Sequence, residues 1–458
     1  MNSKKCKIVF IGAGSAVFTH RVVADILCEP TLSGSTIVLM DIDETRLKLI
    51  KRLINKMIRE NKCKMKIKTT TNRQEALEGA NFVINTIHVG GVDVIHPDFE
   101  IPAKYGLKQT IADTIGAGGI FRFMRVVPVM MSIIKDMERL CPEALFLNYT
   151  NPMCLNTSVI QTLSKIRSVG LCHSVQNVAF QMAKAIGIDY DDVIYSSAGV
   201  NHMAWFHQLE DWDGNDLYPR LRAAIKKDPD CIPPMRKVNA DLFEYFDLFP
   251  TEGSNHHAEY LPYYLKSDKE IERLGIKVNA YIEHFGERTD THEETMKNML
   301  KDSKNFELNS SGEYAVQIIR AFHTNKPERI HASVLNTGSQ IMPEFPSSIS
   351  VEVPVYVDRN GFNAMAVPEG TLPPAPLALA QAHASVYQCA VRGYLEGNRD
   401  LITQAIELDP NVATQLTLPK IRAMVKEMFK ANEGWLREFG SAMARKTSAK
   451  KTAGKGRK

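Results

Sequence analysis

A cysteine and a histidine each stand at the end of an apolar stretch, thirty residues apart. Cys172 follows residues 168–171, and His202 follows residues 198–200. A thiolate and an imidazole that converge would bind a divalent ion such as Mn²⁺ and leave positions open for substrate oxygens. From its type alone, Cys172 could also be a nucleophile or an inert buried thiol. A closed structural zinc site is not expected, because the chain has no second cysteine pair.

Two further segments concentrate polar side chains. Residues 148–152 read Asn-Tyr-Thr-Asn-Pro, and Pro152 favours an extended Asn151 whose amide projects from the loop. The alternative for Asn151 is a turn residue that bonds its own backbone. Residues 252–260 hold two histidines, two glutamates and a tyrosine within nine positions, which suits either a site or a polar surface loop.

The elements that position these residues begin with a glycine turn. Residues 7–11 are apolar and rich in β-branched side chains, and they lead through Gly12 and Gly14 into residues 17–27, which have helical spacing. Such a strand, turn and helix binds the pyrophosphate of a dinucleotide through backbone N–H groups and the helix N-terminus. Val17 stands where the third glycine of the usual motif would be. A structural turn without a ligand is therefore the alternative.

A carboxylate follows the second predicted strand. Asp41 comes directly after residues 36–40, where an acid accepts hydrogen bonds from the adenosine ribose and repels a 2′-phosphate. The sequence therefore predicts NAD rather than NADP as the ligand of the glycine turn. A helix-capping or turn acid is the alternative for Asp41.

Strand-like and helical stretches continue to alternate after this unit. Further strands are predicted at residues 81–87, 144–147 and 168–171, with helices at 73–79 and 128–140. This alternation predicts a parallel sheet, and the carboxyl ends of its strands form the edge where ligands bind in such folds. Asn151 and Cys172 follow two of these strands.

The second half of the chain has a mixed pattern. Strand-like residues 205–209 and 349–357 are interspersed with helical runs at 311–324, 376–396 and 418–439, and residues 358–361 indicate a turn. We therefore expect an α/β protein with a Rossmann-like, NAD-binding parallel sheet domain over residues 1–197. An α+β lobe over residues 198–440 would follow and carry the substrate, metal and oligomer contacts.

The composition is that of an ordinary globular enzyme, with 44% hydrophobic and 24% charged residues among 458. No run approaches the roughly 18 to 20 apolar residues of a membrane-spanning helix, and the first residues lack the apolar core of a secretory signal. The eight cysteines are scattered without a Cys-x-x-Cys pair, which favours a reducing compartment. We expect a cytoplasmic enzyme with no membrane partner.

The last fourteen residues carry most of the excess positive charge. Residues 445–458 contain seven Lys or Arg and no acid, so removing them lowers the net charge from +4 to −3. Residues 441–458 can bury almost nothing apolar, and we expect a disordered basic tail. A nucleic-acid-binding arm is the alternative reading of this tail, although we expect no nucleic-acid partner.

Six motifs, taken in order, resemble glycoside hydrolase family four, and within it they are most similar to the melibiases, its α-galactosidases. The resemblance covers residues 7–439, and the ordered set is far more specific than the glycine turn alone. The motifs are FIGAGS at 10–15 with Phe18, MDID at 40–43, QTIADT at 109–114 before GGI at 118–120, NYTNP at 148–152, GLCHSVQ at 170–176 and VNHMAW at 200–205.

The resemblance implies a redox-assisted elimination that uses NAD and a divalent metal, usually Mn²⁺. NAD⁺ would take hydride from C3 of the sugar, and the resulting ketone would acidify the C2 proton. A base would then remove that proton, the aglycone would leave from C1, water would add, and hydride would return to C3. The metal would polarise the C2 and C3 oxygens.

The same resemblance implies roles for single residues. Cys172 and His202 match the metal ligands, Asn151 matches a substrate contact, and His173 matches the proton donor to the leaving group. The family pattern also places an acid, Asp113, near the metal, and its role is open. The NAD contacts would be Gly12, Gly14, Ser15, Phe18 and Asp41.

The base implied by the resemblance is Tyr260, whose pKa a nearby cation would lower. Its neighbour Glu259 is the alternative base, and in an extended segment the two side chains would point to opposite sides.

The segment before these two residues departs from the melibiase pattern. Residues 253–257 read Gly-Ser-Asn-His-His, where melibiases usually have Ser-Ser-Glu-His, and Arg288 is only a loose candidate for a phosphate contact. An α-glucosidase or an α-hexuronidase of the same family is therefore an alternative to an α-galactosidase.

A simple NAD-dependent 2-hydroxy-acid dehydrogenase is a further alternative, but it would need an Asp/His pair and an arginine rather than a thiolate. A homodimer or homotetramer is what the family implies.

Overall fold

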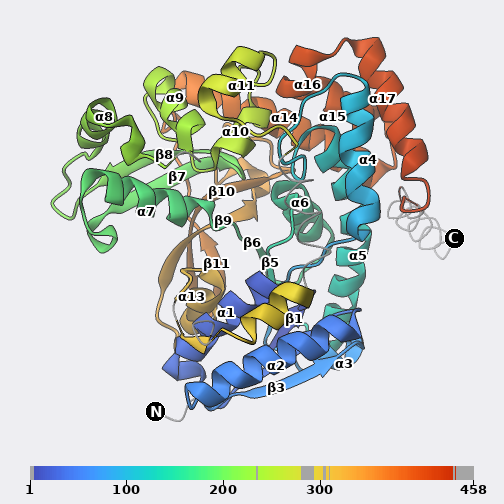
Figure 1. Cartoon of the computed structure of the whole chain (residues 1–458), viewed down its shortest axis with the longest axis vertical. Helices are drawn as coiled ribbons and strands as arrows, with labels where there is room; N and C mark the ends of the chain where they lie inside the picture. The colour runs from blue at the N-terminus through green and yellow to red at the C-terminus, as the bar shows by residue number, and fades with distance from the viewer. Residues whose placement is uncertain are drawn as a thin grey trace, which may run out of the picture.

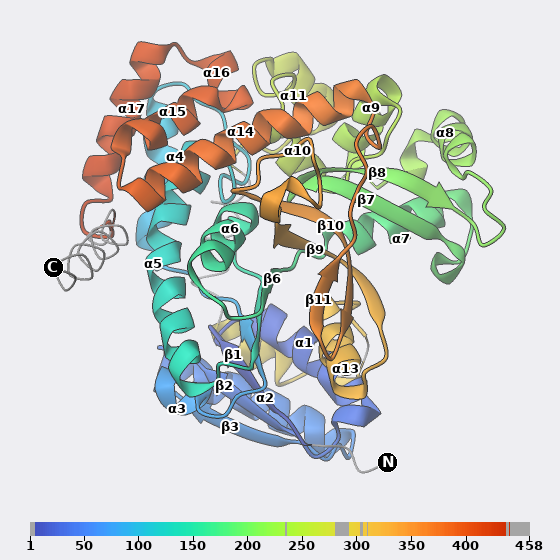
Figure 2. The ribbon, with the colours of Figure 1, turned by 180° about the vertical axis from the view of Figure 1, so that it is seen from behind.

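The computed structural model describes residues 5–233, 236–279, 293–302, 306–308, 310–436 and 439. Arg288 and the predicted tail at 441–458 lie outside these residues. Within them, eleven strands form one sheet in the order β3-β2-β1-β4-β5-β6-β9-β10-β7-β8, with β11 paired to β10. Figures 1 and 2 show this sheet running from the N-terminal strands at the bottom to the β7–β8 hairpin at the top.

The first six strands are parallel, and their order matches that of dinucleotide-binding sheets. Their bounds are β1 (Lys7–Ile11), β2 (Thr36–Met40), β3 (Lys66–Thr70), β4 (Phe82–Asn85), β5 (Leu145–Asn148) and β6 (Ser168–Gly170). The predicted α/β class with a Rossmann-like parallel sheet is thus confirmed.

The remaining strands continue the same sheet in antiparallel fashion. They are β7 (Ile194–Val200), β8 (Met203–Glu210), β9 (Glu328–Leu335), β10 (Ser350–Asp358) and β11 (Gly361–Ala364). β6 meets β9 where Gly170 pairs with Ser333. The domain boundary expected at residue 197 falls inside β7, and the division into two domains stays a prediction.

Helices cover both faces of the parallel strands, and alternate strand residues face different cores. Ile8 and Phe10 of β1 belong to the core beneath α1 and α2, whereas Val9 and Ile11 belong to the core beneath α3 and α5. The helices of the first half are α1 (Ala16–Cys28), α2 (Glu44–Glu60), α3 (Arg73–Leu77), α4 (Gly91–Lys104), α5 (Gly116–Leu140), α6 (Met153–Leu163) and α7 (Ser174–Ile186).

The second half adds helices at the upper end of the sheet, where α14 packs against α6, β7 and β8 (Figure 2). The described helices of the second half are α8 (Tyr218–Lys227), α9 (Lys237–Phe246), α10 (Ser254–Tyr260), α11 (Asp268–Leu274), α13 (Tyr314–Thr324), α14 (Pro374–Glu396), α15 (Arg399–Leu408), α16 (Pro410–Gln415) and α17 (Leu418–Ala431). Among them, α13 lies low on the sheet and packs against α1, β9 and β10 (Figures 1 and 2).

Two elements of the first half illustrate where the sequence pattern misled or was silent. β3 was not predicted, because it is an edge strand whose residues are all at least partly exposed and whose sequence, Lys-Ile-Lys-Thr-Thr, has only one large apolar residue. α5 begins at Gly116, twelve residues before the predicted start at Pro128. Pro128 lies inside the helix, where it removes one backbone N–H donor and its ring crowds the carbonyl one turn earlier, so the tertiary packing of α5 overrides its local cost.

α5 is the one described helix that is long and apolar enough, by length and composition, to cross a membrane. Its most apolar window has a mean hydropathy of 1.5, but 72% of that window is buried inside the protein. α5 is therefore a core helix, with one side on β-strand residues and the other on α4 and α15.

A buried ion pair links α5 to α4 and to the end of α17. The Arg125 guanidinium of α5 donates to both carboxylate oxygens of Asp98 in α4 and, at 2.6 Å, to the side-chain oxygen of Asn432 just after α17. The Arg125 side chain is only 1% exposed. A buried charge that loses its partner is strongly destabilising, so this cluster ties the helices together.

Arg125→Met should destabilise the fold by about 3 to 5 kcal/mol, because it leaves the Asp98 carboxylate buried without its cation. The matched control is Arg273→Met, which removes a guanidinium that is 47% exposed and paired with Asp241 and Glu270. That control should cost about 0 to 1 kcal/mol. Thermal melts of the two variants check the prediction, and equal losses would contradict it.

Candidate active site

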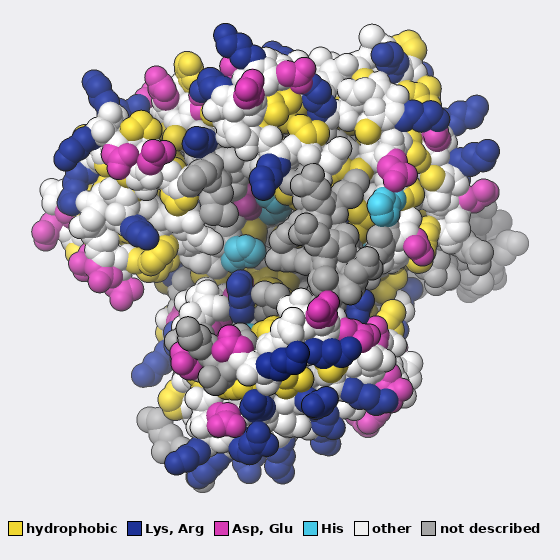
Figure 3. Space-filling view, viewed as in Figure 1, with side chains coloured by type: hydrophobic (Ala, Val, Ile, Leu, Met, Phe, Trp, Pro, Cys, Tyr) yellow, Lys and Arg dark blue, Asp and Glu magenta, His cyan; other side chains and the backbone are white. Residues whose placement is uncertain are grey.

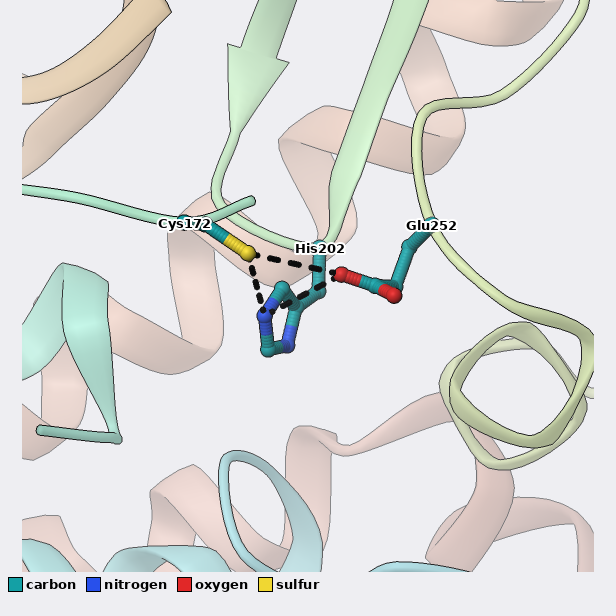
Figure 4. A group of neighbouring side chains, drawn as sticks. All are labelled: Cys172, His202 and Glu252. Carbon is teal, nitrogen blue, oxygen red and sulfur yellow. Dashed lines mark hydrogen bonds and ion pairs between the residues drawn. The ribbon is translucent and has the colours of Figure 1, made fainter. Parts of the chain in front are cut away.

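Three side chains that can bind a metal meet at the carboxyl end of the parallel strands. The Cys172 Sγ atom lies 3.5 Å from His202 Nε2 and 3.7 Å from Glu252 Oε2, and the last two atoms are 3.3 Å apart. Figure 4 shows the three groups pointing toward one another from separate segments. Among the described residues this is the one group of three or more His, Cys, Asp or Glu side chains that could hold an ion.

The backbone that holds His202 is strained. Asn201 and His202 form the two-residue turn between β7 and β8, and His202 has a φ of +69°, in the left-handed region. For a residue with a side chain this conformation costs about 1 to 2 kcal/mol. The turn is held by Glu352 of β10, whose carboxylate accepts a hydrogen bond of 3.0 Å from the Asn201 amide.

The predicted metal ligands were Cys172 and His202, and Glu252 was not among them. It is brought there because residues 249–251 run beside β8: Phe206 N–H donates to Phe249 O, and Thr251 N–H donates to Ala204 O, each at 3.0 Å. This pairing carries Glu252 back toward the turn from which β8 starts. The dense polar character of residues 252–260 was the available signal, but it did not show which acid would face the cysteine.

The protonation states of His202, Glu252 and Cys172 suit a metal ion whose binding releases the proton of the Cys172 thiol. Burial lowers the pKa of His202 to about 4, so its imidazole is neutral and can ligate. Burial opposes ionisation of Glu252, but His202, His256 and Arg236 together hold its pKa below the ordinary value. Burial raises the pKa of the Cys172 thiol well above normal. A bound cation would reverse that shift, because a coordinating thiol is deprotonated outright.

The donor atoms also fit the size of a metal site. Ligands bonded to one ion at about 2.0 to 2.3 Å and near right or tetrahedral angles lie roughly 3 to 4 Å from one another. The three separations at this cluster, 3.3, 3.5 and 3.7 Å, fall in that range. Cys172, His202 and Glu252 could therefore hold a divalent ion with positions left for substrate.

Tyr260 lies on the far side of the His202 ring from these donors. Its hydroxyl is 3.4 Å from His202 Nδ1 and accepts a hydrogen bond of 3.3 Å from the Tyr387 hydroxyl of α14. The side chain is fully buried, and burial raises the pKa of Tyr260 well above its usual value. A cation bound beside His202 would lower that pKa again.

Asp113 and Asn151 form a second polar group of the site. The Asn151 amide donates to the Asp113 carboxylate at 3.1 Å, and Thr114 Oγ1 donates to the same carboxylate at 2.7 Å. Burial opposes ionisation of Asp113, but the neighbouring Arg122 guanidinium, 3.4 Å away, together with His256, His202 and the Thr114 hydrogen bond, lowers its pKa. The side-chain amide of Asn151 thus bonds a residue outside its own loop rather than its own backbone.

Glu259, the alternative base, has a different environment from Tyr260. Residues 254–260 form the helix α10 rather than an extended segment, so neighbouring side chains diverge by about 100° instead of 180°. The Glu259 carboxylate is buried and accepts backbone N–H bonds from Thr110, Ile111 and Ala112.

His173 stands apart from the buried cluster. It is the residue before α7, its side chain is 65% exposed, and its Nδ1 atom lies 3.9 Å from the Glu313 carboxylate. On the face drawn in Figure 3, histidine side chains are visible near the middle of the molecule and at its right. An exposed imidazole next to Cys172 could meet a leaving group that extends toward solvent.

The glycine turn packs closely at the ends of β1, β2 and β4. Gly12 has a φ of +85°, and a Cβ there would lie 2.8 Å from the Thr86 carbonyl, so only glycine fits. Gly14 N–H donates to the Asp41 carboxylate at 2.6 Å, and Asp43 N–H donates to it at 3.0 Å. Asp41 therefore lies against the turn, as a ribose contact would, but it also has the turn-acid role given as the alternative.

The predicted nucleotide contacts connect to the metal cluster through neighbouring loops. Ser15 precedes α1, and its side chain makes no capping hydrogen bond. Phe18 packs against Tyr149, with ring centroids 4.7 Å apart, and Tyr149 is two residues before Asn151. Leu171 N–H donates to Asn148 O at 2.8 Å, which sets the loop of Asn151 beside Cys172.

Two family models match most of this chain. Residues 7–188 match the model described as family 4 glycosyl hydrolase, and residues 197–412 match the C-terminal domain of family 4 glycosyl hydrolases.

Known relatives match nearly the whole chain. It is 36% identical to an α-galactosidase of Bacillus subtilis over 94% of this chain and 99% of that one. It is 33% identical to an α-galactosidase of Rhizobium meliloti over 95% of this chain and 90% of that one. It is also 28% identical to an α-galacturonidase of Thermoanaerobacter italicus over 92% of this chain and 95% of that one.

A solved structure supports the same fold. A 6-phospho-α-glucosidase from gut microorganisms, in complex with NAD and Mn²⁺, is similar with a TM-score of 0.79 and 21% identity, covering 94% of this chain and 99% of that one. The resemblance found in the sequence motifs is confirmed by the family models and the relatives. This chain is an enzyme that belongs to glycosyl hydrolase family 4.

Proposed function

We propose that this enzyme hydrolyses α-galactosides with the help of NAD and a divalent cation, for which Mn²⁺ is the candidate. The observation that carries the proposal is the convergence of Cys172, His202 and Glu252 beside the pair Asn151 and Asp113. Relatives 36% and 33% identical, named α-galactosidases, support the choice of sugar. A related fold in complex with NAD and Mn²⁺ supports the cofactors.

When bound, NAD⁺ would supply a hydride acceptor for C3 of the sugar, and the cation would supply a Lewis acid for the neighbouring oxygens. The residues proposed to hold the dinucleotide are Gly12, Gly14, Ser15, Phe18 and Asp41. The Asp41 carboxylate beside Gly14 would repel a 2′-phosphate, which favours NAD over NADP.

In this proposal Tyr260 removes the C2 proton. Its hydroxyl is within reach of two hydrogen-bonding groups, His202 Nδ1 and the Tyr387 hydroxyl, which would stabilise the phenolate oxygen as donors. Tyr387 packs beside it from α14 and excludes water from the ring. Asn151, oriented by Asp113, would bind a sugar hydroxyl, and the exposed His173 would give a proton to the leaving oxygen.

An α-galacturonide is the second candidate substrate, because α-galacturonidases are also among the relatives, at 28% identity. It would place a carboxylate where α-galactose has a hydroxymethyl group. The family assignment disfavours the simple 2-hydroxy-acid dehydrogenase.

We further propose a cytoplasmic homo-oligomer, a dimer or a tetramer. All eight cysteines are free, which suits a reducing compartment.

The function is tested with a panel of nitrophenyl α-galactoside, α-glucoside and α-galacturonide, each with and without NAD⁺ and Mn²⁺. We expect release of nitrophenol from the α-galactoside only when both cofactors are present, without net NADH, because the hydride returns in each turnover. Cleavage of the α-galacturonide alone would transfer the proposal to the second substrate. Cleavage without either cofactor would overturn the mechanism.

Removing metal ligands should weaken Mn²⁺ binding in the absence of substrate. Cys172→Ser and Glu252→Gln each replace an anionic donor by a neutral, poorer one, and we expect each to lower the affinity by more than about tenfold. Calorimetric titration of Mn²⁺ measures this directly. The control is Cys389→Ser, a half-buried thiol of α14 outside the cluster, which should bind as the wild type does. Unchanged binding in Glu252→Gln would remove Glu252 from the ligand set.

Hydrolysis in D₂O should place deuterium at C2 of the released sugar, because the base exchanges its proton with solvent before the hydride returns. A double-displacement glycosidase never breaks that C–H bond. Tyr260→Phe should lower turnover strongly while NAD and Mn²⁺ still bind. The control is Tyr263→Phe, a partly exposed tyrosine after the same helix. Sugar without deuterium would exclude the elimination, and normal exchange in Tyr260→Phe would exclude only this base.

A further inference from the structure

One buried carboxylate accepts three consecutive backbone N–H groups beside the active site. Glu259 Oε2 accepts from Thr110 at 2.9 Å and from Ile111 at 3.1 Å, and Ala112 N–H lies 3.1 and 3.0 Å from the two oxygens. Glu259 is 2% exposed. Hydrogen bonds to a charged acceptor are about twice as strong as neutral ones, so these bonds form a firm clamp on residues 110–112.

The clamped segment has a conformation that needs support. Ala112 has a φ of +48°, which is unfavourable for a residue with a Cβ. A Cβ on Gly118 would lie 2.6 Å from Ala112 O, so α5 packs directly on this backbone. Thr110 Oγ1 also donates to Asn255 O at 2.5 Å, a second contact to α10. The segment is thus fixed between α5 and α10.

The residue that follows the clamp belongs to the site. Asp113 comes directly after Ala112, and its carboxylate accepts the Asn151 amide at 3.1 Å and faces Arg122 at 3.4 Å. On the other side of Asp113, Gly116 N–H donates to the buried Asp409 carboxylate at 3.0 Å. A shift of residues 110–112 would therefore move the Asp113 carboxylate and release the Asn151 amide.

We propose that Glu259 is a positioning residue that holds the backbone of residues 110–112 and thereby sets Asp113 and Asn151 for substrate binding. The carboxylate is not the base, because its hydrogen bonds within the described residues all come from backbone N–H groups of this segment. This inference rests on the proposed function only in its last step, the effect on substrate. The clamp itself is a property of the protein without ligands.

The clamp is tested by amide hydrogen exchange of the unliganded protein. Glu259→Gln loses the negative charge and presents an NH₂ group to the three donors, so exchange of the amides of residues 110–112 should rise about tenfold or more. Glu259→Asp keeps the charge but shortens the reach, and it serves if the Gln variant does not fold. The matched control is Glu29→Gln, a buried carboxylate that accepts the Thr31 N–H and is outside the site. That control should change exchange only around Thr31 and Arg320, the partners of the Glu29 carboxylate.

The coupling to Asp113 is tested by a double-mutant cycle on the substrate that the wild type cleaves. Glu259→Gln and Asp113→Asn should each lower kcat/KM about tenfold or more, mainly by raising KM. The double variant should be no worse than about twofold below Asp113→Asn alone. Glu29→Gln should have wild-type KM and kcat.

The outcomes separate the inference from the proposed function. Unchanged exchange at residues 110–112, or additive losses in the cycle, would overturn the inference. Loss of C2 deuterium incorporation in Glu259→Gln with unchanged KM would also overturn it, because that result identifies Glu259 as the base. If the wild type cleaves none of the glycosides, the proposed function fails, while the exchange experiment still decides whether the clamp exists.

Discussion

The pairing of Gly170 with Ser333 joins the two halves of the molecule. At this one position the last parallel strand, β6, meets the antiparallel strand β9, and the sheet continues through β10 to β7. Cys172 follows β6, and His202 follows β7, where Gly199 pairs with Glu352 of β10. The separation of the two side chains is therefore set by hydrogen bonds that run across a continuous sheet. A continuous sheet resists a change in this separation far better than two unconnected loops would.

Burial of charge is the second constraint on the site. Glu252, Asp113 and Glu259 are all buried, and a buried carboxylate is costly unless cations or N–H groups surround it. Asp113 has Arg122, and Glu259 has three backbone amides. Glu252 accepts from Gly253 N–H at 2.8 Å and lies near the Arg236 guanidinium, but it also faces the Cys172 thiol and two imidazoles. A divalent cation would best complete the surroundings of Glu252, because it would compensate both anionic donors together.

The sequence predicted those parts of the structure that depend on local pattern. β1, β2 and α1 were placed within a residue or two, since an apolar strand, a glycine turn and a helical repeat are all contained in residues 7–28. The edge strand β3 was missed because partly exposed strands lack the apolar run on which such prediction relies.

The site was predictable only where a motif lay at the end of a strand. Cys172, His202 and Asn151 were singled out because each follows an apolar strand. The parallel order of β5 and β6 brings Asn151 and Cys172 to one edge, whereas His202 lies in the turn of the antiparallel pair β7 and β8. Glu252 and Glu259 were not assigned their places, because these depend on tertiary pairing: residues 249–251 with β8, and residues 110–112 with α10. Glu252 comes one residue after the first of these contacts and Glu259 makes the second itself, but neither contact can be read from the neighbouring sequence.

The short helix α10 shows why these long-range contacts and the site depend on each other. It has seven residues, and its first residue follows Gly253, which has no side chain to cap it. A helix of this length is not stable alone in water. His256 and Tyr260, four positions apart, share the face toward His202, with ring centroids 4.4 and 6.1 Å from that imidazole.

The position of this face must be set from outside the helix. Val238 N–H donates to Ser254 Oγ at 2.9 Å at one end, and the Glu259 carboxylate holds residues 110–112 at the other. The loop of Asp113 and the helix of Tyr260 therefore fix each other, so neither group can move without the other. A carboxylate one position before the tyrosine serves this purpose because it lies about 100° away on the helix, where it can bind the loop while the tyrosine faces the imidazole.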